Sequence, residues 1–317
     1  MRTAAVVAAA MLLALAAPSV AAAAATGRLF VYPHHPRVGE VATFELRPFW
    51  TYVDHLEPAV FPDDYPWRLA AFASKGRAYL VPIKKLADDR YGLSGTFRFP
   101  SQGTWTVCVL NFQPFTDARH GCPRFNPTRQ RVSVLGRHAR VSIWHSLERP
   151  LHIPGLATGD ACPTTEQSGF LASYGIDAPF DSLPAWGPGP AFPTGLGAGS
   201  RPLLRFEYPP LPGSGWEGSG WGGGKNIWVV AGSYRGPVLV RGRRLDGPNE
   251  VRFENGRPGF LPAKRAHPDL ELHLLGPESH GNPATTRVRA PGCYAFQVDG
   301  RGFSYLIVFE ARLLVSS

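Results

Sequence analysis

Residues 289–314, RAPGCYAFQVDGRGFSYLIVFEARLL, decide the fold that the sequence predicts. Pro291-Gly292 is typical of a turn, residues 293–298 of a strand, Asp299-Gly300 of a tight turn, and residues 303–314 of a long last strand. In the first of these strands, large apolar residues occupy every second position, which turns one face of a strand toward a core. The chain is therefore predicted to end in a β-hairpin.

The rest of the chain has the composition of an all-β protein. Gly (35 residues) and Pro (32 residues) make up about a fifth of the 317 residues, which requires many turns. Short segments rich in Val, Phe, Tyr, Trp and Leu lie between the Gly and Pro clusters, and helix-forming runs are scarce. We predict an all-β fold.

The strand-like segments fall into two groups. About seven lie in residues 28–135, and about six lie between residue 225 and the C-terminus. Residues 136–154 are interpreted as a linker. Residues 155–224 are poor in regular β signals but rich in Gly, Pro and Trp, so the second β-sandwich, residues 155–317, is expected to carry a long loop region.

The N-terminus has the pattern of a signal peptide in residues 1–25. A short basic start, Met1-Arg2, precedes an apolar run and a group of small residues suited to cleavage. The apolar run is shorter than the roughly 20 residues that a membrane span needs. We expect an exported protein, extracellular or in the cell envelope, with membrane contact only if the leader stays attached as an anchor.

Four cysteines in an exported chain indicate disulfides. Three pairings are open, and we favour Cys108–Cys122 with Cys162–Cys293, one bond in each predicted domain. The second bond would stabilise the fold by about 3–5 kcal/mol through the chain entropy of its long loop. The C-x-x-C spacing typical of zinc sites does not occur.

The charge of the chain points to anionic partners. The formal net charge is +9, without the Lys/Arg run of a nucleic-acid-binding arm, so an anionic surface or envelope polymer fits better than nucleic acid. We interpret the widest basic cluster as a solvated strand face. Its members are Arg235, Arg241, Arg243 and Arg244.

A resemblance to a known group of proteins comes from residues 95–107, GTFRFPSQGTWTV. This stretch resembles a hairpin of exported bacterial Ig-like domains, including copper-resistance-C-like proteins and cell-surface domains, and the resemblance covers residues 28–135. It implies an Ig-like β-sandwich for residues 28–135. Together with the second group of strands, we predict two tandem Ig-like β-sandwich domains after the signal peptide. Copper-binding members use a histidine near the mature N-terminus and Met- or His-rich loops. Because Met1 and Met11 are the only methionines and lie in the leader, the mature protein is not expected to carry copper(I) on thioethers.

The second half resembles a domain of uncharacterised exported proteins of Gram-positive-type bacteria. The matching strings are GDACPTT, GPGPAFP, KNIWVV, GPVLVRGRRLDG and PGCYAFQVDGRGFSYLIVF. No activity comes with this resemblance, so it implies no catalytic residues.

Histidines provide the weak metal candidates. His34-His35 lies between prolines near the mature N-terminus and would need a further ligand such as His55 or His120. Glu271 and His273, two residues apart, would share one face of a strand. The alternative is that both pairs are solvated polar residues, and we assign no metal and no cofactor.

Aromatic residues beside glycines are the main binding candidates, because sugars stack on exposed rings and glycine lets a ligand approach. The alternative is that the same rings fill the core. The six candidates are Trp186, Tyr208, Trp216, Trp221, Trp228 and Tyr234.

Together these patterns favour an exported, non-catalytic binding or structural module of the cell envelope, in contact with a glycan or an anionic envelope polymer. One alternative is a secreted hydrolase of envelope material whose acids or histidines converge only in three dimensions. Another is an extracytoplasmic metal-handling protein. The sequence assigns no catalytic residue.

Overall fold

The computed structural model describes most of the chain outside the predicted leader. The described residues are 27–48, 68–73, 78–86, 89–110, 122, 128–157, 159–197, 199–210, 212, 217–255, 268–277 and 281–314. Their regular structure is β, apart from two 3-10 turns, η1 (His145–Leu147) and η2 (Leu171–Tyr174), which confirms the all-β prediction. No helix in these residues is long and apolar enough to cross a bilayer.

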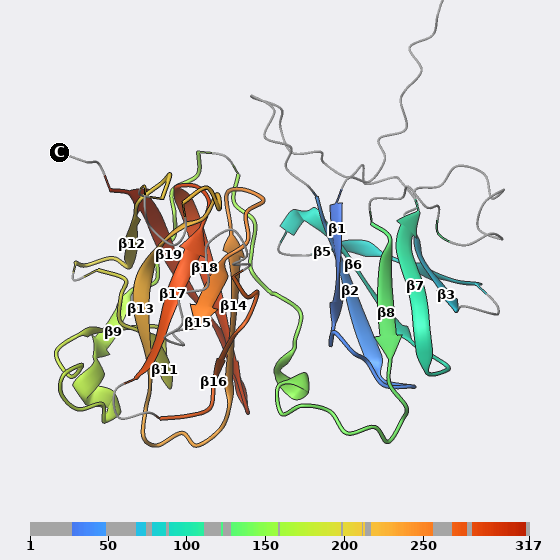
Figure 1. Ribbon diagram of the computed structural model, residues 1–317, viewed down its shortest axis with the longest axis horizontal. Helices are drawn as coiled ribbons and strands as arrows, with labels where there is room; N and C mark the ends of the chain where they lie inside the picture. Colours follow the sequence, from blue (N-terminus) through green and yellow to red (C-terminus); the bar gives the residue numbers. More distant parts are fainter. Residues whose placement is uncertain are drawn as a thin grey trace, which may run out of the picture.

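The first group of strands forms two four-stranded antiparallel sheets (Figure 1). One has the order β1 (Gly27–Tyr32), β2 (Val41–Pro48), β6 (Asp89–Arg98), β5 (Lys84–Leu86). The other has the order β4 (Ala78–Pro82), β3 (Arg68–Ala73), β7 (Gly103–Leu110), β8 (Gln130–Val134). Side chains from both sheets share one core, in which Phe99 and Trp105 lie edge to face at 5.2 Å between ring centroids. The GTFRFPSQGTWTV hairpin therefore supplies core aromatics.

The second group of strands forms a four-stranded sheet, a five-stranded sheet and a two-stranded ribbon. One sheet has the order β11 (Ala191–Pro193), β13 (Gly222–Val230), β17 (Asn282–Val288), β15 (Arg252–Asn255). The other has the order β12 (Leu203–Phe206), β19 (Phe303–Leu313), β18 (Gly292–Gly300), β14 (Val238–Arg244), β16 (Leu272–Leu274). The ribbon pairs β9 (Gln167–Phe170) with β10 (Pro184–Trp186). Strands β9 to β12 lie in residues 155–224, so this region is more regular than the sequence predicted.

The C-terminal hairpin is confirmed, but its turn lies two residues later than predicted. Strand β18 continues to Gly300, which pairs with Phe303, so the turn is Arg301-Gly302. Gly302 has φ +85°, a left-handed conformation that favours glycine. Asp299, expected in the turn, is instead a fully buried strand residue.

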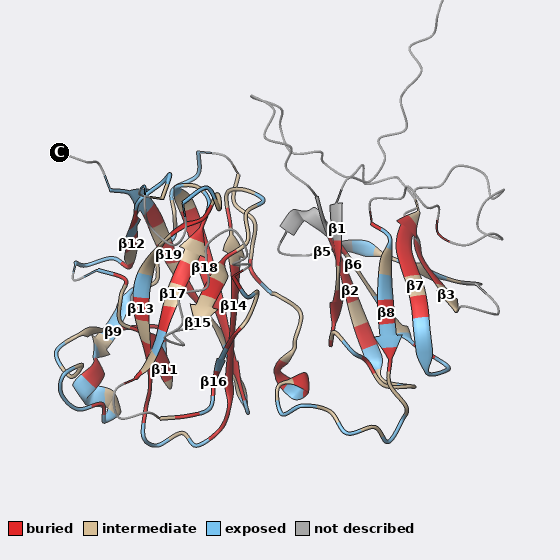
Figure 2. Cartoon of the chain, in the orientation of Figure 1, coloured by how far each residue is buried: buried red, intermediate tan, exposed pale blue. Residues whose placement is uncertain are grey.

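Strand β18 is buried on both faces. Tyr294, Phe296 and Val298 point into the main core of the second group, as the alternation predicted. The opposite face is covered by the segment between η1 and β9, in which Ile153 packs with Cys293 and other apolar side chains. Figure 2 shows buried residues as red bands along the strands that enclose each core. A central strand with two covered faces fixes the register of its neighbours.

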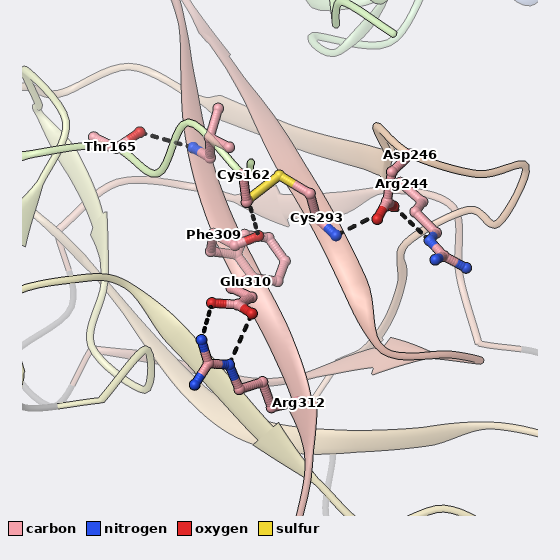
Figure 3. The surroundings of a disulfide bond; sticks show 9 residues. Cys162, Thr165, Arg244, Asp246, Cys293, Phe309, Glu310 and Arg312 are labelled. Atoms are coloured by element: carbon pink, nitrogen blue, oxygen red, sulfur yellow. Dashed lines mark hydrogen bonds and ion pairs between the residues drawn. A yellow bond between two sulfur atoms is a disulfide. The ribbon is translucent and has the colours of Figure 1, made fainter. Parts of the chain in front are cut away.

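Both favoured disulfides are present, Cys108–Cys122 and Cys162–Cys293. Figure 3 shows the second bond joining the covering segment to β18. Beside it, the Thr165 hydroxyl oxygen accepts a hydrogen bond from the Val308 N–H at 2.8 Å. The Asp246 carboxylate accepts one from the Cys293 N–H at 3.2 Å. The segment is thus held to the sheet by a covalent bond and by hydrogen bonds.

The covered face of β18 also holds a buried ion pair. Arg241 donates to the Asp299 carboxylate at 2.8 Å, and their side chains are 4% and 0% exposed. Gln297 donates to the same carboxylate oxygen at 2.9 Å. The interpretation of the arginine cluster as a solvated strand face is therefore wrong for Arg241, because this side chain neutralises a buried acid.

We predict that Arg241→Leu lowers the free energy of unfolding by about 3–5 kcal/mol, because it leaves a buried carboxylate without its closest cation. Urea unfolding measures this loss. The double variant Arg241→Leu/Asp299→Asn removes both charges and should recover most of it. A loss below about 1 kcal/mol in the single variant would show that the ion pair is dispensable.

We predict that replacing Cys162 and Cys293 together by Ala costs about 5 kcal/mol of stability, since the bond closes a sequence separation of 131 residues. The matched control replaces Cys108 and Cys122, which are separated by 14 residues, and should cost about 3 kcal/mol. Denaturant unfolding of both variants tests the ranking, and the reverse order would contradict it.

Candidate functional site

Two of the predicted binding aromatics lie in the core. Trp186 and Trp228 are both 0% exposed. The Trp228 ring lies edge to face against Phe296, with ring centroids 5.3 Å apart. Neither ring can stack on a ligand at the surface, so the binding prediction is wrong for this pair. Burial of large aromatic area between the sheets explains their position.

Tyr234 is half-buried and holds a turn. Its hydroxyl donates to the Pro237 carbonyl at 3.0 Å and accepts from the Arg301 N–H at 2.8 Å. Its ring packs edge to face on Phe303. These contacts connect the β13–β14 loop to the turn of the C-terminal hairpin. Trp216 lies outside the described residues.

Tyr208 and Trp221 lie at one end of the second group of strands. Tyr208 follows β12 and is 42% exposed, and Trp221 immediately precedes β13. The backbones of the chain around β12 and β13 come close together at this end. A Cβ added at Gly222 would lie only 2.5 Å from the Glu207 carbonyl oxygen. Glycine at this position therefore permits the close approach of the two backbones.

Two arginines flank the Trp221 ring. The guanidinium carbon of Arg289 lies 4.2 Å from the ring centroid, and that of Arg252 lies 5.8 Å away. Both distances suit cation–π contacts. Arg252 is also paired with Glu250. Arg289 is exposed, and no carboxylate among the described residues forms an ion pair with it.

We call Tyr208, Trp221, Arg252 and Arg289 the aromatic end. It combines an exposed phenol ring, a mostly covered indole that is 7% exposed, and an exposed guanidinium. The exposed Tyr208 ring offers an apolar face to a sugar, and Arg289 offers charged donors to phosphate or carboxylate groups. The Trp221 indole is buried under the arginines and offers no exposed face of its own. The arrangement can hold a polymer that carries both chemistries.

The histidine candidates lie where the two groups of strands meet the linker. The backbone N–H of His34 donates a hydrogen bond to the Glu148 carboxylate at 2.7 Å. The ring nitrogen Nδ1 of His34 lies 3.7 Å from the carboxylates of Glu148 and Glu271. Within the described part of the chain, no group of three or more His, Cys, Asp or Glu side chains is suited to a metal ion. His55 and His120, the proposed further ligands, lie outside that part.

Glu271 is shared between two histidines. His273 hydrogen-bonds to it at 3.2 Å and stacks on Trp144 of the linker, with ring centroids 4.3 Å apart. Burial raises the pKa of Glu271, but the His273 hydrogen bond and the charges of His34 and Arg241 outweigh burial, so the net pKa is lowered. We call His34, Trp144, Glu148, Glu271 and His273 the linker cluster.

Sequence reasoning predicted that Glu271 and His273 share one strand face, but it missed the other contacts of the linker cluster. Trp144 and His34 are remote in sequence from β16, and no local spacing connects them. The only signal was the position of Trp144 within the predicted linker, where a large aromatic needs a packing partner.

Comparison with known proteins gives remote structural matches. No family model and no curated protein matches the sequence. Among solved structures, invasin, described as a bacterial integrin-binding protein, has a TM-score of 0.22 and 10% identity, covering 91% of this chain and 40% of its own. A putative membrane-anchored protein from Corynebacterium diphtheriae has a TM-score of 0.19 and 12% identity, covering 92% and 60%. The D0-D1 domain of intimin has a TM-score of 0.20 and 6% identity, covering 90% and 94%.

The chain thus spans less than two thirds of the first two structures. Superpositions with TM-scores near 0.2 do not support a transfer of function, so the geometry of this chain has to carry the functional argument.

The lowered pKa of Glu271 predicts a pH dependence of stability. A carboxyl group whose pKa is lower in the folded state stabilises the fold above its unfolded pKa, and this contribution disappears as the pH falls through the folded pKa. We therefore expect the stability difference between the native chain and Glu271→Gln to shrink between about pH 5 and pH 3. Urea unfolding across this range, with exposed Glu166→Gln as the control, checks this. A constant difference would contradict it.

Proposed function

We propose that this chain is an exported, non-catalytic binding module of the cell envelope, and that its aromatic end contacts an anionic glycan or a related envelope polymer. Export is supported by the leader-like N-terminus and by two disulfides, which persist in oxidising compartments. The net charge of +9 supports an anionic partner.

The observation that carries the proposal is the pairing of Arg289 with Trp221 beside exposed Tyr208. The guanidinium is exposed and lies 4.2 Å from the ring centroid, so it is held over the ring without an acidic partner among the described residues. A side chain fixed in this way loses less conformational entropy when an anion binds. Tyr208 adds a ring face for a sugar or for the backbone of a polymer.

The test measures binding of the purified exported protein to immobilised poly(glycerol phosphate), with dextran as the neutral polymer. We expect Arg289→Ser to weaken binding to the anionic polymer about tenfold, and Tyr208→Ser to weaken it severalfold. The matched control is Arg201→Ser. Arg201 is also exposed, but it precedes β12 whereas Tyr208 follows it, so it lies toward the opposite end of that strand.

Binding should also fall as salt rises, because exposed charges are screened. Equal binding to dextran and to the anionic polymer would remove the electrostatic part of the proposal. Equal losses from Arg201→Ser and Arg289→Ser would indicate attraction by overall charge and would overturn the assignment of the aromatic end.

A further inference from the structure

A cavity of about 500 Å³ opens between β1 and β8, the edge strands of the two sheets in the first group. Residues of β1, β7 and β8 line it together with His34 and His35. Leu270, which precedes β16 in the second group, completes the lining. The cavity lies away from the aromatic end, and the proposed function does not use it.

The cavity opens here because the chain changes its β-pairing partner between β1 and Arg37. Residues of β1 pair with β2 in one sheet, whereas Arg37 forms a parallel bridge with Leu135 at the end of β8. Two hydrogen bonds fix the crossing, from the Val38 N–H to Leu135 and from the Leu135 N–H to Pro36, at 3.0 and 2.9 Å. The chain therefore connects the two sheets only at the residues that follow His35. Before this crossing, β1 and β8 stay apart, and the cavity lies between them.

The polar lining favours an anion. Arg131 and His35 are both exposed, and Thr104 and Ser133 add hydroxyl donors beside them. Among the described residues, no carboxylate lines the cavity and Arg131 forms no ion pair with an acid; Glu148 and Glu271 contact only the lining residue His34 at its edge. A positive, donor-rich wall without acids is complementary to carboxylate or phosphate.

The apolar lining favours a ligand with a small hydrophobic body. Phe30 and Leu270 contribute the accessible apolar part of this wall, because both are half-buried, whereas Leu29 and Val31 belong to the core and are 4% and 1% exposed. The volume lies within the usual range for small-molecule sites, roughly 300–1,000 Å³. An ion as small as free phosphate would leave most of this space unfilled.

The linker cluster holds one wall in place. His34 lies between Glu148 and Glu271 at 3.7 Å from each, and Glu271 follows Leu270 directly in the chain. The cavity is therefore complete only when the second group of strands is packed against the first.

We propose that this cavity is a binding site for a small amphiphilic anion. Its carboxylate or phosphate contacts Arg131 and His35, and its apolar part packs on Phe30 and Leu270. Because the wall includes Leu270, occupancy also stabilises the packing of the two groups of strands against each other.

The experiment titrates the full exported chain with hexanoate, hexyl phosphate and hexanol, and follows backbone and histidine NMR signals. We expect saturable shifts at His35 and Arg131 with at least one anion, and at least about tenfold weaker binding of hexanol. The anion that binds more tightly identifies the head group as a carboxylate or a phosphate. Saturating anion should also raise the thermal midpoint.

Variants separate this site from general attraction by charge. Arg131→Ser should weaken anion binding about tenfold, whereas Arg140→Ser, at another exposed arginine, and Arg289→Ser, at the aromatic end, should leave it unchanged. Leu270→Ala should weaken binding of both anions through lost apolar contact. Thermal unfolding verifies that each variant is folded. Absence of saturable shifts with both anions, equal binding of hexanol, or an unchanged affinity in folded Arg131→Ser would each overturn the proposal.

Discussion

The buried carboxylate of Asp299 is the constraint on which the second half of the molecule depends. A carboxyl group with no exposed surface requires compensating donors, and these come from separate parts of the chain. Arg241 comes from β14, Gln297 from β18 itself, and Arg149 from the linker, with Arg149 3.5 Å from the carboxylate. Arg149 also donates to the carbonyl oxygens of Gly300 and Phe303, on either side of the hairpin turn. The acid therefore fixes the final hairpin and the linker together. Arg241 extends the effect to β1, because its guanidinium carbon lies 5.2 Å from the Tyr32 ring centroid.

This network explains why local sequence rules succeeded for the strands and failed for the turn. The alternation in residues 293–298 is a local signal, and it predicted β18. The even cysteine count predicted disulfides but left three pairings open, and the pairing favoured for one bond per predicted domain is the one present. Asp-Gly is also a strong local turn signal, yet Asp299 stays in the strand because Arg241 and Gln297 satisfy its carboxylate there. Tertiary contacts of this kind override propensity. The same pairing removed Arg241 from the predicted solvated face, since a strand pattern does not show which face a covering segment will bury.

The candidate sites were harder to predict because the packing of the strands, and not the local sequence, decides which aromatic side chains are exposed. Glycines lie near both Trp221 and Trp228 in the sequence, and both rings are buried, at 7% and 0% exposure. Trp228 belongs to the main core, whereas Trp221 lies under two arginines. Trp228 lies within β13, whereas Trp221 immediately precedes the first residue of that strand. The difference between the two rings therefore depends on where β13 begins. The sequence made His34 a metal candidate because His35 follows it and because the pair lies near the mature N-terminus. Its actual partners are Glu148, which follows η1, and Glu271, which immediately precedes β16. Sequence separation of this size leaves no local pattern.

The positive charge of the chain divides into two populations with different consequences. Many arginines are satisfied within the fold, as shown by Arg241 with Asp299, Arg244 with Asp246 and Arg287 with Glu254. These charges hold the structure together and attract external anions only weakly, because a neighbouring acid cancels each of them. Arg289 and Arg131 are exposed and, among the described residues, have no acidic partner. Arg289 lies over the Trp221 ring, and Arg131 lines the β1–β8 cavity. An external anion gains most where a cation is uncompensated, so both proposed anion sites are placed at these arginines rather than assigned to net charge alone.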